Sequence, residues 1–144
     1  MQALAAAGLL APLMFTGLVV LQGIANPDYD WIALPISALA TWPTGWIQTL
    51  NFYALGTLTV LHAIGLHLGI QRHSPGLLGP GLLVVSGIGA CVSGLVPMTR
   101  DANGALGEPS GHAVGAILTF MGTGLGLTFA SRRMAHDPAW RRLS

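Results

Sequence analysis

Residues 111–131 read GHAVGAILTFMGTGLGLTFAS, an apolar stretch without a single Asp, Glu, Lys or Arg. An α-helix needs about 20 mostly apolar residues to cross the hydrocarbon core of a bilayer. Small residues recur in this stretch at steps of three or four, which places them on one helical face. They are Gly111, Gly115, Thr119, Gly122, Gly126 and Ala130. The stretch therefore predicts a membrane-spanning helix with one smooth side.

Three further apolar stretches predict spans at about residues 3–24, 47–70 and 76–97. The whole chain is 52% hydrophobic and only 8% charged, whereas soluble domains carry about a quarter charged residues. The first stretch has no basic region before it, so we expect a retained helix and not a cleaved signal. We predict an all-α integral membrane four-helix bundle, a single transmembrane domain over 1–144 with its tail at 132–144.

The arginines indicate how the chain sits in the membrane. With four spans, both termini and the turn at 71–75 lie on one side. That side carries Arg72, Arg132, Arg133, Arg141 and Arg142, whereas the other side carries only Arg100. Cytoplasmic loops are enriched in basic residues. We therefore predict a multi-pass protein of a bacterial inner (cell) membrane with both termini in the cytoplasm.

The first outer loop, 26–46, is rich in tryptophan. It contains Trp31, Trp42 and Trp46, three of the four tryptophans of the chain. Indole rings prefer the headgroup level of a bilayer. We expect an interfacial segment here, with a short helix from about Trp31 to Ala40 capped by Asp30.

Small-residue faces on the third and fourth spans predict close helix packing, because association in lipid depends on van der Waals fit. Packing within the chain is favoured, and a homo-oligomer or companion helices remain as the alternative. The residues concerned are Gly122, Gly126, Ser86, Ala90 and Gly94. The other expected partners are membrane lipids, since a net charge of +1 gives no indication of a nucleic acid.

Polar residues concentrate on the outer side, where we expect a shared site. They are Asp28, Asp30, Ser37, Asn51, Arg100, Asp101, Glu108, Ser110 and His112. His112 lies in the first turn of its helix, where the dipole favours a neutral ring able to act as a base. Asp101 could orient it and Ser37 could supply a hydroxyl, as hydrolysis or acyl transfer on a lipid-like substrate requires. The alternative, which we favour, is a polar cap that binds water or a ligand through Asp28, Asp30, Asn51, Arg100 and Glu108.

No metal site and no cofactor are predicted. His62 and His67 in the second span lie about 140° apart around the helix, so they cannot form an i, i+4 ligand pair. Asp101-Ala102-Asn103-Gly104 lacks the remaining ligands of a calcium loop. The single cysteine, Cys91, lies in an apolar stretch and is interpreted as a packing residue.

Several short motifs follow one another in a distinctive order. They are Tyr29-Asp30, Pro35-Ile36-Ser37-Ala38-Leu39, Trp46, Asn51-Phe52, Gly56, Gly94-Leu95-Val96-Pro97-Met98-Thr99-Arg100-Asp101, Gly111-His112 and Asp137-Pro138-Ala139-Trp140-Arg141. In this order they resemble the bacterial and archaeal membrane proteins grouped as domain of unknown function 998. The resemblance implies no established activity. It does imply that Ser37, Asn51, Asp101 and His112 belong together. Family members usually have about six helices, so we expect a short member, a fragment, or half of an assembly that another subunit completes.

Three functions follow from these features, in order of preference. The first is a membrane protein that binds a lipid or small amphiphile at the outer face. The second is an intramembrane lipid-modifying hydrolase or acyltransferase that uses His112 and Asp101. The third is a small transporter or accessory subunit, disfavoured because no charge lies in the middle of a span and no inverted repeat is visible.

Overall fold

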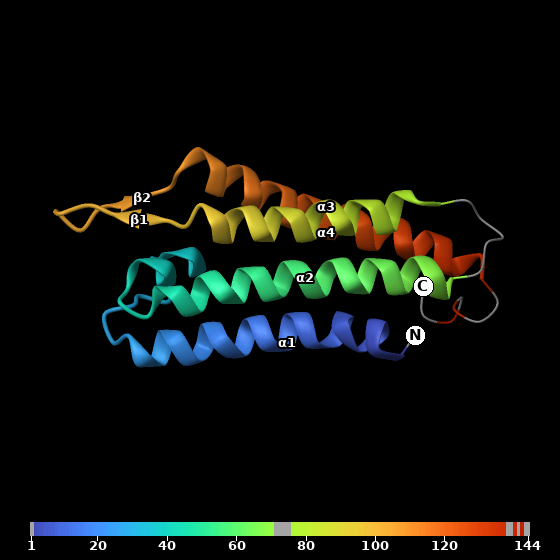
Figure 1. Ribbon diagram of the computed structural model, residues 1–144, viewed down its shortest axis with the longest axis horizontal. Coiled ribbons are helices and arrows are strands. Elements are labelled where there is room, and N and C mark those ends of the chain that lie inside the picture. Colours follow the sequence, from blue (N-terminus) through green and yellow to red (C-terminus); the bar gives the residue numbers. More distant parts are fainter. Residues whose placement is uncertain (1, 71–75, 138–139, 141, 143–144) are drawn as a thin grey trace.

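Four long α-helices make up most of the molecule, as the sequence predicts (Figure 1). The computed structural model describes residues 2–70, 76–137, 140 and 142, with only the backbone at 2, 3 and 5. The helices are α1 (Gln2–Ala25), α2 (Gly45–Gly69), α3 (Leu78–Leu95) and α4 (Ser110–Ala135). Each is long and apolar enough to cross a membrane. The prediction of an all-α membrane bundle is confirmed.

The helices lie side by side along the long axis of the molecule, and their order in space follows their order in the chain (Figure 1). The main helix contacts are α1 with α2, α2 with α3, and α3 with α4. Both chain ends lie at one end of the bundle, which we call the terminal end. The opposite end, where α1 passes to α2 and α3 passes to α4, is called the hairpin end.

Two short elements occupy the hairpin end. A 3₁₀-helix, η1, spans Ile36–Thr41, and strands β1 (Thr99–Arg100) and β2 (Leu106–Gly107) pair antiparallel. Gly104 closes the β-hairpin with a positive φ of 84°, a conformation that glycine adopts without steric cost.

The interfacial helix predicted from Trp31 to Ala40 is wrong in its bounds. Asp30 caps a separate turn, in which its Oδ1 accepts hydrogen bonds from the backbone N–H groups of Ile32 and Ala33. Pro35 then has an extended conformation, with φ −68° and ψ 152°, so helical structure begins only after it. Trp31 remains 52% exposed, in keeping with a side chain at headgroup level.

The predicted bounds of α4 also need correction. The helix begins at Ser110, one residue before the expected start, and the carbonyl oxygen of Pro109 accepts hydrogen bonds from the N–H groups of His112 and Ala113. The helix continues to Ala135, past the expected end at 131. Arg133, 7% exposed, donates from Nη1 to the carbonyl of Gly76 and from Nη2 to that of Ile70. These bonds hold the last turn of α4 against the neighbouring helix ends.

The small-residue faces of α3 and α4 meet each other within the chain. A Cβ built on Gly89 would lie 2.6 Å from the carbonyl oxygen of Gly115, and one on Gly122 would lie 2.9 Å from Ser86 Cβ. The Ser86 hydroxyl is 2.9 Å from the carbonyl oxygen of Thr119, to which it donates. Such close approach of backbones is what a smooth face permits. Ala90 is buried as well, and Gly94 faces α2, where its Cβ would lie 3.2 Å from Phe52 Cβ.

Candidate functional site

His112 is buried at the start of α4 and joins this helix to the end of α3. Its side chain is 2% exposed. Nδ1 lies 3.1 Å from the carbonyl oxygen of Ser93 and 3.0 Å from that of Val96. Both partners can only accept, so Nδ1 carries the proton. The two bonds fix the ring and leave Nε2 as its remaining polar atom.

A cavity of about 140 Å³ adjoins this histidine. Its apolar lining includes Phe15 of α1, Phe52 and Leu55 of α2, and Phe120 of α4. Its polar lining consists of Ser37 of η1, Ser93 of α3, and His112 and Thr119 of α4. The cavity therefore combines an apolar wall with a few polar atoms, the usual composition of a small-molecule site.

Ser37 and His112 provide the uncommitted polar atoms of this cavity. The Ser93 hydroxyl donates to the carbonyl oxygen of His112 at 3.3 Å, and that of Thr119 donates to Gly115 at 2.8 Å. In the described part of the chain, the Ser37 hydroxyl has no hydrogen-bond partner, and His112 uses only Nδ1. The structure thus places two of the three predicted catalytic residues on one cavity.

Asn51 lies behind the cavity wall. Its side chain is 1% exposed, and Nδ2 donates to the carbonyl oxygen of Phe15 at 3.1 Å. The ring of Phe15 packs against that of Phe52, with 5.8 Å between the ring centroids. Asn51 therefore holds the backbone that carries a lining side chain.

Two glutamines that the sequence reasoning missed adjoin Asn51. Gln22 Nε2 donates to Gln48 Oε1 at 2.9 Å, and Asn51 Nδ2 lies 3.5 Å from the same oxygen. We call these three residues the carboxamide cluster. Of the three amides, only Asn51 was predicted to belong to the site. Their presence in otherwise apolar predicted spans was the available signal.

The carboxamide cluster is only partly satisfied. Gln22 Oε1, Gln48 Nε2 and Asn51 Oδ1 are buried and have no hydrogen-bond partner among the described residues. Burial of an amide without a hydrogen-bond partner is unfavourable, and polar side chains in a membrane form hydrogen bonds across helices. The cluster therefore favours the pairing of α1 with α2 near the hairpin end.

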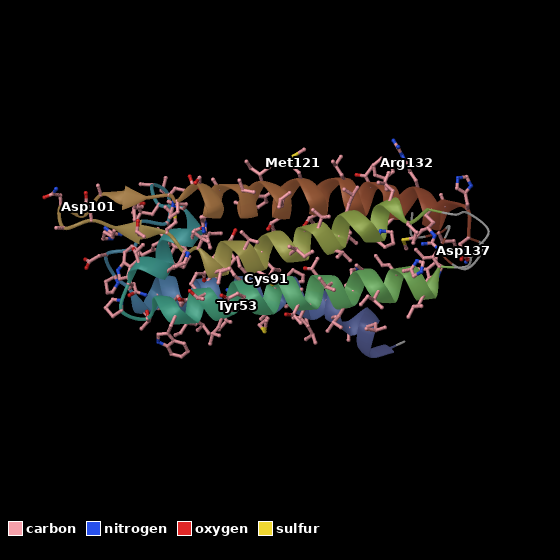
Figure 2. All side chains as sticks on the ribbon, turned by 45° about the horizontal axis from the view of Figure 1, so that its top comes forward. Tyr53, Cys91, Asp101, Met121, Arg132 and Asp137 are labelled. Atoms are coloured by element: carbon pink, nitrogen blue, oxygen red, sulfur yellow. The ribbon has the colours of Figure 1, made fainter. Side chains whose placement is uncertain are left out.

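Asp101 is not close to His112. It lies in the β-hairpin, which projects beyond the helices (Figure 2). Its Oδ1 accepts from the N–H groups of Asn103 at 2.9 Å and Ala105 at 2.8 Å. The carboxylate thus stabilises its own turn, while backbone carbonyls of α3 take the position at Nδ1 where an orienting carboxylate was expected.

The other charged residues predicted for the site lie on the surface of the hairpin end. Arg100 stacks on the Trp42 ring at 4.6 Å and donates from Nε to Thr41 Oγ1 at 3.3 Å, which ties the hairpin to η1. Asp28 and Glu108 are exposed. Hydrogen bonds from the backbone of Ala33 and Ile32 hold the pKa of Asp30 below its ordinary value.

His62 and Cys91 pack against glycines of neighbouring helices. The His62 ring packs directly on Gly8 of α1, and His67 is exposed. Cys91 packs opposite Gly56, whose Cβ would lie 2.5 Å from its Sγ. Within residues 2–70, 76–137, 140 and 142, no three His, Cys, Asp or Glu side chains are grouped as metal ligands. His73 lies outside the described residues.

A family model described as "Protein of unknown function (DUF998)" matches residues 9–144. No curated protein and no solved structure matches the chain. The match covers η1, the hairpin and every residue that lines the cavity beside His112.

Proposed function

The chain belongs to the DUF998 family, and from this premise we propose that it is a multi-pass membrane protein that binds an amphiphile beside His112. The proposal rests on one observation. Polar atoms of Ser37 and His112 that have no hydrogen-bond partner among the described residues line the same cavity as three phenylalanines. A neutral ring with its proton on Nδ1 offers Nε2 as an acceptor. A ligand hydroxyl could donate to Nε2 while its apolar part packs against Phe15, Phe52 and Phe120.

The size of the cavity restricts the group that enters it. An engineered apolar cavity of about 150 Å³ binds benzene, and the cavity here measures about 140 Å³. A ring or a short branched chain fits this volume, whereas a whole phospholipid does not. We therefore propose that the hydroxyl-bearing end of the amphiphile enters and the rest extends into the bilayer.

Hydrolysis or acyl transfer is the second candidate, because Ser37 and His112 line the same cavity. A base in such chemistry becomes positively charged, and a carboxylate at Nδ1 stabilises that charge. The carbonyl oxygens of Ser93 and Val96 would fix the tautomer but carry no net charge. Binding is therefore the stronger proposal.

Matched ligands and variants test the binding site. The ligands are 4-butylphenol and butylbenzene, which differ by one hydroxyl, and the measurement is the shift in Tm of purified protein in detergent. We expect 4-butylphenol to give the larger shift. Ala116→Phe fills the cavity and should abolish this difference. Val114→Phe adds the same ring to a residue of α4 that is 53% exposed and should preserve it.

His112→Asn tests the role of Nε2. Asparagine retains a donor near the position of Nδ1 but lacks the second ring nitrogen. The variant should stay folded and respond equally to the two ligands. A preference for 4-butylphenol that survives both His112→Asn and Ala116→Phe would contradict the proposal.

We also propose that the terminal end lies in the cytoplasm of a cell with an inner membrane. Arg132, Arg133 and Arg142 lie at this end of the described chain, against Arg100 at the hairpin end, and basic residues favour the cytoplasmic side. A reporter fused after Ser144 should report cytoplasm, and one inserted at Gly104 should report the outside. The opposite labelling would reverse the orientation.

A further inference from the structure

A second polar cavity lies at the terminal end, at the other end of the bundle from His112. It measures about 280 Å³ and lies where α3 begins and α4 ends. Its lining includes Leu78 and Gly79 of α3, Phe129, Arg132 and Arg133 of α4, and His136, which follows α4. We call it the basic cavity. It shares no lining residue with the cavity beside His112.

Two charged side chains of the described part of the chain line the basic cavity, and both are cationic. They are Arg132, which is exposed, and Arg133, which is 7% exposed. The nearest carboxylate along the chain belongs to Asp137, which is buried and does not line the cavity. Arg132 projects outward from α4, whereas Asp137 lies beyond the end of the helix (Figure 2). An anion in the cavity would therefore meet guanidinium groups, with no competing carboxylate among the described lining residues.

The start of α3 adds a partial positive charge to that of the two arginines. Leu77 is the N-cap residue of this helix, and its side chain makes no capping hydrogen bond. The first N–H groups of an α-helix have no partner within the helix, and the helix dipole is positive at this end. Leu78 and Gly79, which line the cavity, lie in this first turn.

Arg133 supplies an independent reason to expect a ligand. Its Nη1 and Nη2 atoms donate to the carbonyl oxygens of Gly76 and Ile70 at 3.2 and 3.1 Å, but Nε has no partner among the described residues. Carbonyl oxygens satisfy hydrogen bonds without neutralising a charge. A cation that is more than nine-tenths buried thus borders the cavity with its donor capacity incompletely used.

We propose that the basic cavity binds a phosphate group, with a phospholipid of the adjoining leaflet as its source. Guanidinium groups and helix N-termini are both established phosphate-binding elements. The cavity also has an apolar side, formed by Leu78, which is 54% exposed, and Phe129, over which Arg132 stacks at 5.6 Å. The lining of the cavity thus changes from basic to apolar at the ends of membrane-spanning helices. This arrangement matches the headgroup region of a lipid.

Native mass spectrometry of the purified full chain in detergent tests the proposal. The probes are phosphatidylglycerol, phosphatidylcholine and inorganic phosphate. We expect phosphatidylglycerol to bind more tightly than phosphatidylcholine, since choline places a cation near the arginines. Arg132→Gln should weaken phosphatidylglycerol binding about tenfold, as expected for loss of one charge-assisted hydrogen bond, and Arg132→Lys should restore part of it.

Arg142→Gln is the matched control, because Arg142 is exposed at the same end and does not line the cavity. It should leave phosphatidylglycerol binding unchanged. Equal losses in Arg132→Gln and Arg142→Gln would overturn the proposal in favour of general charge attraction. Inorganic phosphate at millimolar concentration could instead displace phosphatidylglycerol from the unaltered chain but not from Arg132→Gln. The site would then bind free phosphate, and the proposal of a phospholipid as its source would be overturned. Failure of the 4-butylphenol experiment would leave these outcomes unaffected, because the two cavities are separate.

Discussion

The α3–α4 interface brings backbone against backbone, whereas the α1–α2 interface near the hairpin end is held by side-chain amides. On α3 and α4, a Cβ at Gly89, Gly115 or Gly122 would approach the facing helix to 2.6–2.8 Å. Between α1 and α2, Gln22 bonds Gln48 at 2.9 Å and Asn51 bonds the backbone of α1. Water provides no driving force between helices inside a membrane, so close packing and hydrogen bonds are the two means available.

The two interfaces should differ in what they tolerate. A glycine surface has no spare volume, so any added carbon forces the helices apart. Hydrogen bonds between amides depend on geometry, but removing one adds no volume to the interface. Removing both partners of a hydrogen bond can leave the stability nearly unchanged. The comparison predicts that added side-chain volume at the α3–α4 interface lowers the stability of the bundle most. Loss of one polar partner at the α1–α2 interface should lower it moderately.

The largest effect is expected for Gly122→Leu. Its first added carbon would already lie 2.8 Å from the carbonyl oxygen of Leu82, and overpacking typically costs about 1–3 kcal/mol. Thermal unfolding in detergent should show a large fall in Tm. Gly124→Leu is the matched control, because nothing lies within 4 Å of a Cβ built there. Gly115→Ala would be a poor control, since its Cβ would lie 2.6 Å from Ser93 Oγ.

A smaller loss is expected for Gln48→Met, which keeps the length of the side chain but removes the acceptor for Gln22. Hydrogen bonds between membrane helices contribute about 0.6 kcal/mol on average and up to about 1.7. The double variant Gln22→Met/Gln48→Met should recover part of this loss, because Gln22 is then no longer left without its Gln48 acceptor. A double variant as unstable as the sum of the single variants would show that the amides do not act as a pair.

The smallest effect concerns Asp30, whose capping bonds lie outside both interfaces. Its pKa is lowered in the folded state, so the stabilisation is present above the unfolded-state pKa and is lost as pH falls through the folded-state pKa. The amide NMR signals of Ile32 and Ala33 should report a midpoint below the ordinary value of 3.8. Asp30→Asn should remove this transition without changing Tm measurably. A midpoint at or above 3.8 would contradict the hydrogen-bonding pattern.

The spans and the smooth faces could be predicted because each depends on local composition and helical spacing. The spacing of Gly115, Gly122 and Ser86 favoured packing of α3 against α4, although the spacing alone left open a second chain as the partner. The bounds of η1 were missed, because Pro35 interrupts the loop after a turn that Asp30 caps independently.

The partners of His112 could not be read from the sequence. A helix end leaves carbonyl groups without partners, and α3 ends at Leu95. Ser93 and Val96 therefore present acceptors close to the start of α4. Recognising this requires knowing that the two helices are adjacent and antiparallel. An acidic residue such as Asp101 is a plausible partner only while that geometry is unknown.

The agreement between chain order and spatial order has a consequence for biosynthesis. Chains fold from the N-terminal side as they are made, and here α2, α3 and α4 each pack on the helix that precedes them in the chain. Every helix pair can thus assemble as soon as its second member enters the bilayer, without waiting for a distant segment. The cavity beside His112 is different, because its wall includes residues of α1, η1, α2, α3 and α4. It becomes complete only when α4 has joined the other three helices, so the nascent chain acquires this cavity later than it acquires the α1–α2 and α2–α3 contacts.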